Sequence, residues 1–297
     1  MILIAGGSGQ LGHALTGLAK ARGLEFRAVS RPELNFATPD SIDACFAAAQ
    51  PSLVINAAAY TAVDAAETNR DAAVAGNVTG PQRLAQLCAD AGIPFIHVST
   101  DYVFDGAKGA PYVETDPTGP TGVYGETKLQ GEQAVLATGA DAIILRTAWV
   151  YGAHGKNFAR TMLQAGAKLP QLRVVADQLG TPTAAPELAR VILDIADTLR
   201  RTGWRAEYRG IFHATGAGET TWHGFATAIF AAAAAMGYNP PALQAITTAD
   251  WPTPARRPAD SRLDCRKLAR VFGITSPEWR ENLGPIVQQL LSMDRPN

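Results

Sequence analysis

A glycine-rich segment directly after the first apolar run constrains the fold of this chain more than any other feature. Gly6-Gly7-Ser8-Gly9-Gln10-Leu11-Gly12 follows the apolar residues Ile2–Ala5 and leads into a helical pattern. Glycines are needed where a strand turns tightly into a helix and where backbone approaches a pyrophosphate. The helix N-terminus then offers free N–H groups and partial positive charge to the phosphates. The segment fits G-x-G-x-x-G from Gly7 or G-x-x-G-x-x-G from Gly6. Either reading predicts a strand–turn–helix unit that binds a dinucleotide, and we expect Gly6, Gly9 and Gly12 to contact or support the cofactor.

Short apolar runs alternate with helical patterns through the first two thirds of the chain. Continuous apolar strands separated by helices are typical of a parallel sheet that is covered on both faces. We therefore expect an α/β fold with a doubly wound parallel sheet of the Rossmann type. The expected strands are Ile2–Ala5, Phe26–Ser30, Leu53–Asn56, Phe95–Ser99, Ala142–Thr147, Leu172–Val175 and Ile211–Ala214. The expected helices are Leu11–Ala21, Pro39–Ala49, Asp71–Ala91, Val123–Leu136 and Ala185–Arg200.

The alternation of strands and helices ends near Gly216. The rest of the chain shows a helical pattern over Trp222–Met236, two proline-rich stretches, and further helical patterns over Cys265–Phe272 and Pro277–Leu291. We read this part as a smaller lobe that packs against the sheet. The expected division is a dinucleotide-binding domain of residues 1–152 and 172–215 and a substrate-binding lobe of residues 153–171 and 216–297.

Composition and charge exclude several classes of protein. The formal net charge is −1 and no basic run occurs, which argues against nucleic acid or an anionic membrane as the main partner. The three cysteines are far apart and have no metal-ligand spacing, as expected for reduced thiols in the cytosol. The first residues lack the charged region of a signal peptide, and the apolar stretch Ile229–Met236 is far shorter than the roughly 20 residues of a membrane span. We expect a cytoplasmic protein.

The end of the second expected strand bears on the choice of dinucleotide. An acidic residue at this point binds the ribose 2′-hydroxyl of NAD. Here the strand ends in Val29-Ser30-Arg31, with no carboxylate before Glu33. The Arg31 guanidinium matches the oxygens of a 2′-phosphate, and the alternative is that it only stacks on the adenine or faces solvent. The strand end favours NADPH, with NADH as the alternative.

Tyr124 and Lys128 are candidates for proton transfer. Their spacing places both side chains on one face of a helix. A free tyrosine has a pKa near 10, and a lysine ammonium about 4–6 Å away lowers that pKa by favouring the phenolate. The lysine can also hold the nicotinamide ribose hydroxyls. Thr100 (or Ser99), at the end of the fourth expected strand, can donate a hydrogen bond to a carbonyl oxygen.

The glycine-rich segment, Thr100 and the Tyr124/Lys128 pair, together with the strings STDYVFDG (99–106) and LRTAWVYG (145–152), resemble the dTDP-4-dehydrorhamnose reductase family of the extended short-chain dehydrogenase/reductase superfamily. They keep the family's order over almost the full chain. STDYVFDG together with LRTAWVYG is much more specific than the Tyr–Lys spacing, which serves the whole superfamily. The resembling segments are Gly6–Gly12, VINAAAYTAVDAAE (54–67), STDYVFDG (99–106), YGETKLQGE (124–132), LRTAWVYG (145–152), DQLGTPT (177–183) and RPADSRL (257–263).

The resemblance implies a function and a set of site residues. The implied reaction is the NADPH-dependent reduction of the C4 ketone of dTDP-4-dehydro-6-deoxy-L-mannose to dTDP-L-rhamnose. Tyr124 would protonate the C4 oxygen, Lys128 would tune it and bind the cofactor ribose, and Thr100 would assist at the carbonyl. Thr100, Asp101 and Trp149 would line the sugar pocket. The implied cofactor contacts are Gly9, Gln10, Leu11, Asn35, Phe36, Ala58, Ala59 and Tyr60.

Two departures from the family's pattern leave questions open. Asn35 stands where many relatives carry aspartate, which leaves the adenosine contacts undecided. Ala14 replaces a glutamate that some members use in a magnesium-linked dimer contact, so we expect no metal and keep a homodimer as one option. Arg256 and Arg257 are candidates to meet the substrate diphosphate, or else a solvated pair.

Two other functions stay open at this point. A related nucleotide-sugar ketoreductase, epimerase or dehydratase is the first, because a dehydratase needs an acidic residue beside Thr100 and Asp101 qualifies. A non-catalytic regulatory subunit is the second. Such proteins often lose the tyrosine or the lysine, whereas this chain retains Tyr124 and Lys128. Consumption of reduced cofactor separates a reductase from epimerases and dehydratases, which return the cofactor oxidised.

Overall fold

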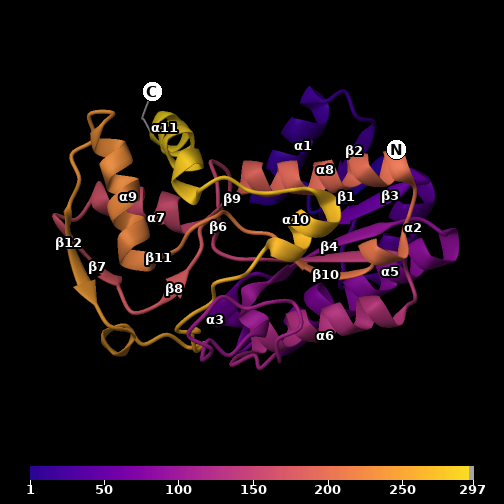
Figure 1. The fold of residues 1–297 in the computed structure, drawn as a ribbon, viewed down its shortest axis with the longest axis horizontal. Coiled ribbons are helices and arrows are strands. Elements are labelled where there is room, and N and C mark those ends of the chain that lie inside the picture. The colour runs from indigo at the N-terminus through magenta and orange to yellow at the C-terminus, as the bar shows by residue number, and fades with distance from the viewer. Residues whose placement is uncertain (294–297) are drawn as a thin grey trace.

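A six-stranded parallel sheet forms the centre of the computed structural model, which describes residues 1–293 (Figure 1). All neighbouring strands of this sheet run parallel. In order across the sheet, the strands are β10 (Gly210–His213), β5 (Ala142–Thr147), β4 (Phe95–Thr100), β3 (Leu53–Asn56), β1 (Ile2–Ala5) and β2 (Phe26–Val29). The expected parallel sheet is confirmed.

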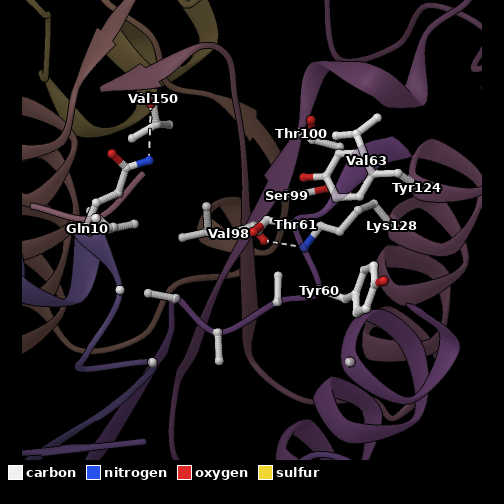
Figure 2. A pocket seen from close by; sticks show the side chains of 18 of the residues that line it. Gln10, Tyr60, Thr61, Val63, Val98, Ser99, Thr100, Tyr124, Lys128 and Val150 are labelled. Atoms are coloured by element: carbon white, nitrogen blue, oxygen red, sulfur yellow. Dashed lines mark hydrogen bonds between the residues drawn. The ribbon is translucent and has the colours of Figure 1, made fainter. Parts of the chain in front are cut away.

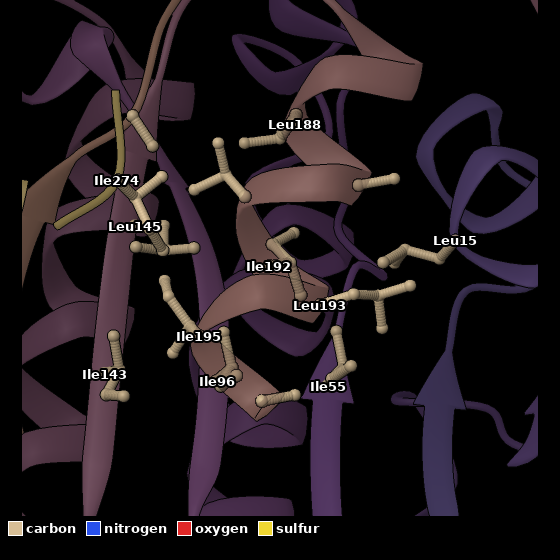
Figure 3. Packing of buried hydrophobic residues seen from close by; sticks show 14 of the residues in the cluster. Leu15, Ile55, Ile96, Ile143, Leu145, Leu188, Ile192, Leu193, Ile195 and Ile274 are labelled. Carbon is tan, nitrogen blue, oxygen red and sulfur yellow. The ribbon is translucent and has the colours of Figure 1, made fainter. Parts of the chain in front are cut away.

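Helices cover both faces of the sheet because its strands are apolar on both sides. In β1, Ile4 packs with the helices on one face and Leu3 with those on the other, and Ile55 and Val54 divide in the same way in β3. One face carries α1 (Gln10–Ala21) and α8 (Ala185–Thr202). The other carries α2 (Pro39–Ala49), α5 (Gly80–Ala91) and α6 (Val123–Ala137). Figure 3 shows Ile192 and Ile195 of α8 packed over the strands. The fold is therefore doubly wound, as predicted.

The winding direction of the sheet reverses at β1. This strand pairs with β2 on one side and with β3 on the other. The loops that follow β1 and β3 therefore leave the sheet beside each other, and the crevice between them is where such sheets bind ligands. The glycine-rich segment follows β1, and the small residues 57–59 follow β3.

The helix expected over Asp71–Ala91 is not a regular α-helix. It consists of α4 (Arg70–Val74), a π-helical turn (Ala75–Thr79) and α5. The short helix α3 (Val63–Ala66) precedes it. The π-helical turn contains the fully buried Asn77, whose contacts are described with the site.

A second hydrophobic cluster lies outside the sheet. It is built from α7 (Phe158–Gly166), α9 (Trp222–Ala234) and α11 (Leu283–Met293) together with β7 (Gln171–Val175), which pairs with β12 (Ala242–Ile246). These elements form the left half of Figure 1. Two more strand pairs lie outside the central sheet, β6 (Val150–Tyr151) with β9 (Thr183–Ala184) and β8 (Leu179–Gly180) with β11 (Thr220–Thr221). Short 3₁₀ turns occur at Asp101–Val103, Ala206–Tyr208, Thr248–Asp250 and Trp279–Asn282.

Two expected placements are wrong. The strand expected at Leu172–Val175 does not join the central sheet. It pairs with β12, and Leu172 and Val174 pack in the second cluster, although they fall in the range 172–215 assigned to the cofactor domain. Conversely, α10 (Arg266–Phe272), expected in the lobe, packs Leu268 into the core over the sheet. The division into two domains otherwise stays a prediction, and residues 294–297 of the expected lobe lie outside the described residues.

Candidate active site

One pocket at the carboxyl end of the sheet gathers the residues singled out in the sequence. Its volume is about 920 Å³. Of the residues predicted to bind the cofactor, to bind the sugar or to act in catalysis, Gly12 alone does not line it. The predicted residues that do are Gly6, Gly9, Gln10, Leu11, Arg31, Asn35, Phe36, Ala58, Ala59, Tyr60, Thr100, Asp101, Tyr124, Lys128 and Trp149. Figure 2 shows Gln10 on one side of this pocket and Tyr124 and Lys128 of α6 on the other.

Backbone packing explains the glycines of the first turn. Gly6 has a φ of +88°, and a Cβ there would lie 2.7 Å from the backbone nitrogen of Ala58. Gly12 lies beneath the turn, where a Cβ would lie 2.1 Å from the Gly6 carbonyl oxygen, so its role is close packing of α1 on the turn. Gly9 is the N-cap of α1, which directs the free N–H groups of that helix toward the pocket end of the turn.

The end of the pocket at β2 contains a polar loop. Ser30 Oγ accepts a hydrogen bond from the Ser8 N–H at 2.8 Å and ties this loop to the glycine turn. Asn35 uses its amide locally, because Oδ1 accepts from the Ala37 N–H and Nδ2 donates to Thr38 Oγ1, each at 3.2 Å. Arg31 is exposed at the rim and makes no salt bridge with the residues that the structure describes. Its guanidinium is therefore available to an anion.

Asn77, which sequence reasoning missed, fixes the loop after β3. Its Oδ1 accepts from the Tyr60 N–H at 2.8 Å. Its Nδ2 donates to the Tyr60 carbonyl at 3.2 Å and to Thr127 Oγ1 at 3.1 Å. Asn77 thereby joins the small-residue loop to α6, the helix that carries Tyr124 and Lys128. In the sequence, the one sign of this role is that Asn77 is a polar residue on the apolar face of the helix expected over Asp71–Ala91.

Lys128 and Tyr124 lie together on α6, but their electrostatics differ from the expectation. Lys128 is buried, and its Nζ donates to the Val98 carbonyl oxygen at 2.7 Å (Figure 2). Burial lowers the pKa of Lys128 to about 8, which the charge of Glu132 opposes. Burial also raises the pKa of Tyr124 to about 12, against the effect of the nearby Thr100 hydroxyl. The expected lowering of the tyrosine pKa is therefore wrong, because burial raises this pKa by more than the Thr100 hydroxyl lowers it.

Thr100 and Asp101, at the end of β4, are joined by a hydrogen bond between their side chains. The Thr100 hydroxyl donates to Asp101 Oδ1 at 3.0 Å and accepts from the Tyr102 N–H at 3.2 Å. Burial raises the pKa of Asp101 to about 6, which hydrogen bonds with the Ser261 and Thr100 side chains oppose. Ser99, the alternative donor to a carbonyl oxygen, already donates its hydroxyl hydrogen to Glu132 Oε1 at 2.5 Å. Thr100 is thus the better candidate to bind a carbonyl oxygen.

Two tryptophans from different parts of the chain form one wall of the pocket. Trp149 stacks on Trp222, with ring centroids 3.5 Å apart and planes 8° from parallel. The Trp222 Nε1–H donates to Gln178 Oε1 at 3.1 Å. Trp149 has a φ of +46°, an uncommon backbone conformation for a bulky residue that is held by the surrounding packing. Trp222 had no local motif to mark it, and only the fold brings it to the site.

Some features lie outside the site. Neither Arg256 nor Arg257 is among the lining residues, and Arg257 pairs with Asp64 at 2.8 Å. Among residues 1–293, no group of three or more His, Cys, Asp or Glu side chains is placed to hold a metal ion. The helices of this same range include none that is long and apolar enough to cross a membrane.

Comparison with known proteins places the chain in a family. The family profile described as the RmlD substrate binding domain matches residues 1–292. A dTDP-4-dehydrorhamnose reductase of Sinorhizobium fredii is 42% identical, over 98% of this chain and 97% of that protein. The crystal structure of a dTDP-4-dehydrorhamnose reductase from Clostridium acetobutylicum has a TM-score of 0.89 and 36% identity, over 98% of this chain and 99% of that one.

A second solved structure adds a ligand. The dTDP-4-dehydrorhamnose reductase of Bacillus anthracis, solved in complex with NADP, has a TM-score of 0.88 and 29% identity, over 97% of this chain and 98% of that one. The relatives match in length as well as in sequence, so the resemblance extends over the sheet, the second cluster and the pocket between them. The chain belongs to the dTDP-4-dehydrorhamnose reductase family of NAD(P)H-dependent oxidoreductases.

Proposed function

We propose that this chain reduces the C4 ketone of dTDP-4-dehydro-6-deoxy-L-mannose to dTDP-L-rhamnose with NADPH. The observation that carries the proposal is the single pocket in which Tyr124, Lys128 and Thr100 meet the glycine turn. The names of the full-length relatives support the choice of substrate.

The pocket suits a nicotinamide dinucleotide. The glycine turn leaves no room for a Cβ at Gly6 and opens onto the N-terminus of α1, an arrangement that accepts a pyrophosphate. Ala58, Ala59 and Tyr60 provide a neighbouring wall of backbone and small side chains. When bound, the reduced nicotinamide supplies a hydride to the ketone carbon. The exposed Arg31 favours NADPH over NADH, because its guanidinium matches a 2′-phosphate.

Tyr124 is the proposed acid that protonates the C4 oxygen. Because burial raises its pKa to about 12, the phenol keeps its proton at neutral pH, and reduction of a ketone needs this protonated form. The buried Lys128 ammonium offsets the negative charge that proton transfer leaves on the phenol oxygen. The Thr100 hydroxyl is placed to hydrogen-bond the same C4 oxygen once it turns from Asp101. The Asp101 carboxylate, released by Thr100, can then accept a hydrogen bond from a sugar hydroxyl.

The stacked tryptophans are the proposed support for the sugar ring. Trp149 and Trp222 present an aromatic surface at the boundary between the sheet and the second cluster. The nucleotide part of the substrate then lies toward that cluster. Binding energy from such a remote group positions the reacting centre, so a truncated substrate loses turnover as well as affinity.

The test is consumption of reduced cofactor by the purified protein. With dTDP-4-dehydro-6-deoxy-L-mannose generated in situ, the absorbance of NADPH should fall, and the free keto sugar should give little reaction. An epimerase or a dehydratase would convert the nucleotide sugar without net loss of NADPH. No loss of absorbance with the nucleotide sugar and either cofactor would refute the proposed reaction.

A further inference from the structure

A fully buried ion pair joins α6, the helix that carries Tyr124 and Lys128, to β5. Glu132 of α6 and Arg146 of β5 are 1% and 2% exposed. Arg146 Nε donates to Glu132 Oε1 at 2.9 Å, and Nη2 donates to Oε2 at 2.6 Å. Removing two charges from water costs so much that an apolar pair is often at least as stable. A buried pair beside a reaction site therefore calls for an explanation other than stability.

The surroundings of Glu132 fix its carboxylate in one position. Arg146 is the register partner of Ser99 across β4 and β5, so both side chains reach Glu132 from the same part of the sheet. The Ser99 hydroxyl donates to Glu132 Oε1 at 2.5 Å. Three hydrogen bonds from two strands thus hold the carboxylate, which leaves it little freedom to turn away from its neighbours.

Glu132 lies one helical turn after Lys128, on the same face of α6. Of the other titratable groups around Lys128, Tyr124 has a raised pKa and is neutral at pH 7, and the buried His97 of β4 has a pKa well below its usual value. Asp101, after the end of β4, accepts its hydrogen bond from Thr100. Burial penalises the charged form of Lys128, and the negative charge of Glu132 opposes this penalty.

We propose that Glu132 is a positioning residue that keeps the buried Lys128 ammonium charged, and that Arg146 and Ser99 hold the Glu132 carboxylate in place for this purpose. The proposal rests on the proposed function in one respect, namely that Lys128 supports cofactor and proton chemistry. Glu132 acts only through Lys128 and lies outside the lining of the pocket.

The experiment measures NADPH affinity against pH, from the fluorescence of the bound cofactor, and needs no sugar. A charged Lys128 can donate to the nicotinamide ribose, so affinity should fall as pH rises through the lysine pKa, near 8 in the unchanged protein. In Glu132→Gln the midpoint of this fall should move down by about one pH unit. In Arg146→Gln, which breaks the same ion pair but leaves the carboxylate, the midpoint should not move down.

The comparison of the two variants decides the matter. If the pair only held the fold together, both substitutions would have the same effect, and an equal shift or an unshifted Glu132→Gln midpoint would overturn the proposal. Because either single variant leaves a buried group unpaired, circular dichroism and melting temperature check folding. If Glu132→Gln does not fold, the double variant Glu132→Gln/Arg146→Gln replaces it; its midpoint should also move down, but by less, because the positive charge of Arg146 is removed as well. A protein that binds NADPH without reducing the sugar would refute the proposed reaction and leave this test intact.

Discussion

The two ends of the pocket are lined by different kinds of chemical groups. The cofactor end consists of backbone and small side chains around Gly6 and Ala58, with Arg31 exposed at its rim. The catalytic end consists of buried polar side chains, among them Asp101 and Lys128. Recognition at the first end depends on the shape of a turn, whereas chemistry at the second depends on how burial changes proton affinities. Substitutions at the two ends should therefore fail in different ways.

The largest effect is expected at the catalytic end. Tyr124→Phe removes the proposed acid but keeps the ring that packs edge-on against Tyr102, with centroids 5.6 Å apart. We expect turnover to fall by at least ~10²-fold, the range that general acid catalysis supplies, with NADPH affinity nearly unchanged. Steady-state rates and cofactor titration check this expectation. A variant that retains more than half of the original rate would remove Tyr124 from the mechanism.

An intermediate effect is expected at the cofactor end. Gly6→Ala combines a positive φ with a steric clash against Ala58, so NADPH affinity should fall by more than about tenfold. Gly23→Ala is the matched control, because Gly23 also has a positive φ, of +65°, but nothing lies within 4 Å of its Cβ position. The control should lose about 1 kcal/mol of unfolding free energy and keep its affinity. Equal affinity losses in the two variants would show that the turn has no special role.

The smallest effect is expected at the rim. Arg31→Ala should weaken NADPH binding by about 1 kcal/mol, roughly fivefold, which is less than the about 1.5–3 kcal/mol of a buried charge-assisted hydrogen bond because the side chain is exposed. NADH binding should be unchanged. Arg201→Ala, at an exposed position near the end of α8, controls for the general loss of positive charge. A loss that is the same for both cofactors would show that Arg31 does not contact the 2′-phosphate.

The sheet was predictable from the sequence to a degree that the second cluster was not. Ile2–Ala5, Leu53–Asn56 and Ala142–Thr147 are strands with the bounds expected for them. From β1 to β5 a helix separates each strand from the next, and consecutive strands lie beside each other or one strand apart. The second cluster instead pairs Gln171–Val175 with Ala242–Ile246, which are distant in the chain. The local sequence pattern of either segment does not predict which distant segment it will pair with.

The residues of the site were likewise predictable only where one local segment contains them. Tyr124 and Lys128 could be identified because residues four apart in a helix lie on the same face, which is visible in the sequence. Glu132, Arg146 and Trp222 were not assigned roles, because their importance comes from contacts between elements. The direction of the Tyr124 pKa shift was wrong for a related reason, since spacing gives the neighbours of a side chain but not its depth.

The π-helical turn at Ala75–Thr79 has a consequence for how the chain can vary in length. A π-helical turn holds one residue more than an α-helical turn. Deleting one residue here would let α4 and α5 join as one regular helix and would rotate one against the other by about 100°. Asn77 would then leave the Tyr60 backbone, and α5 would present a different face to α6. Insertions and deletions that a surface loop tolerates are therefore excluded from this segment, so its residue count matters more than its composition.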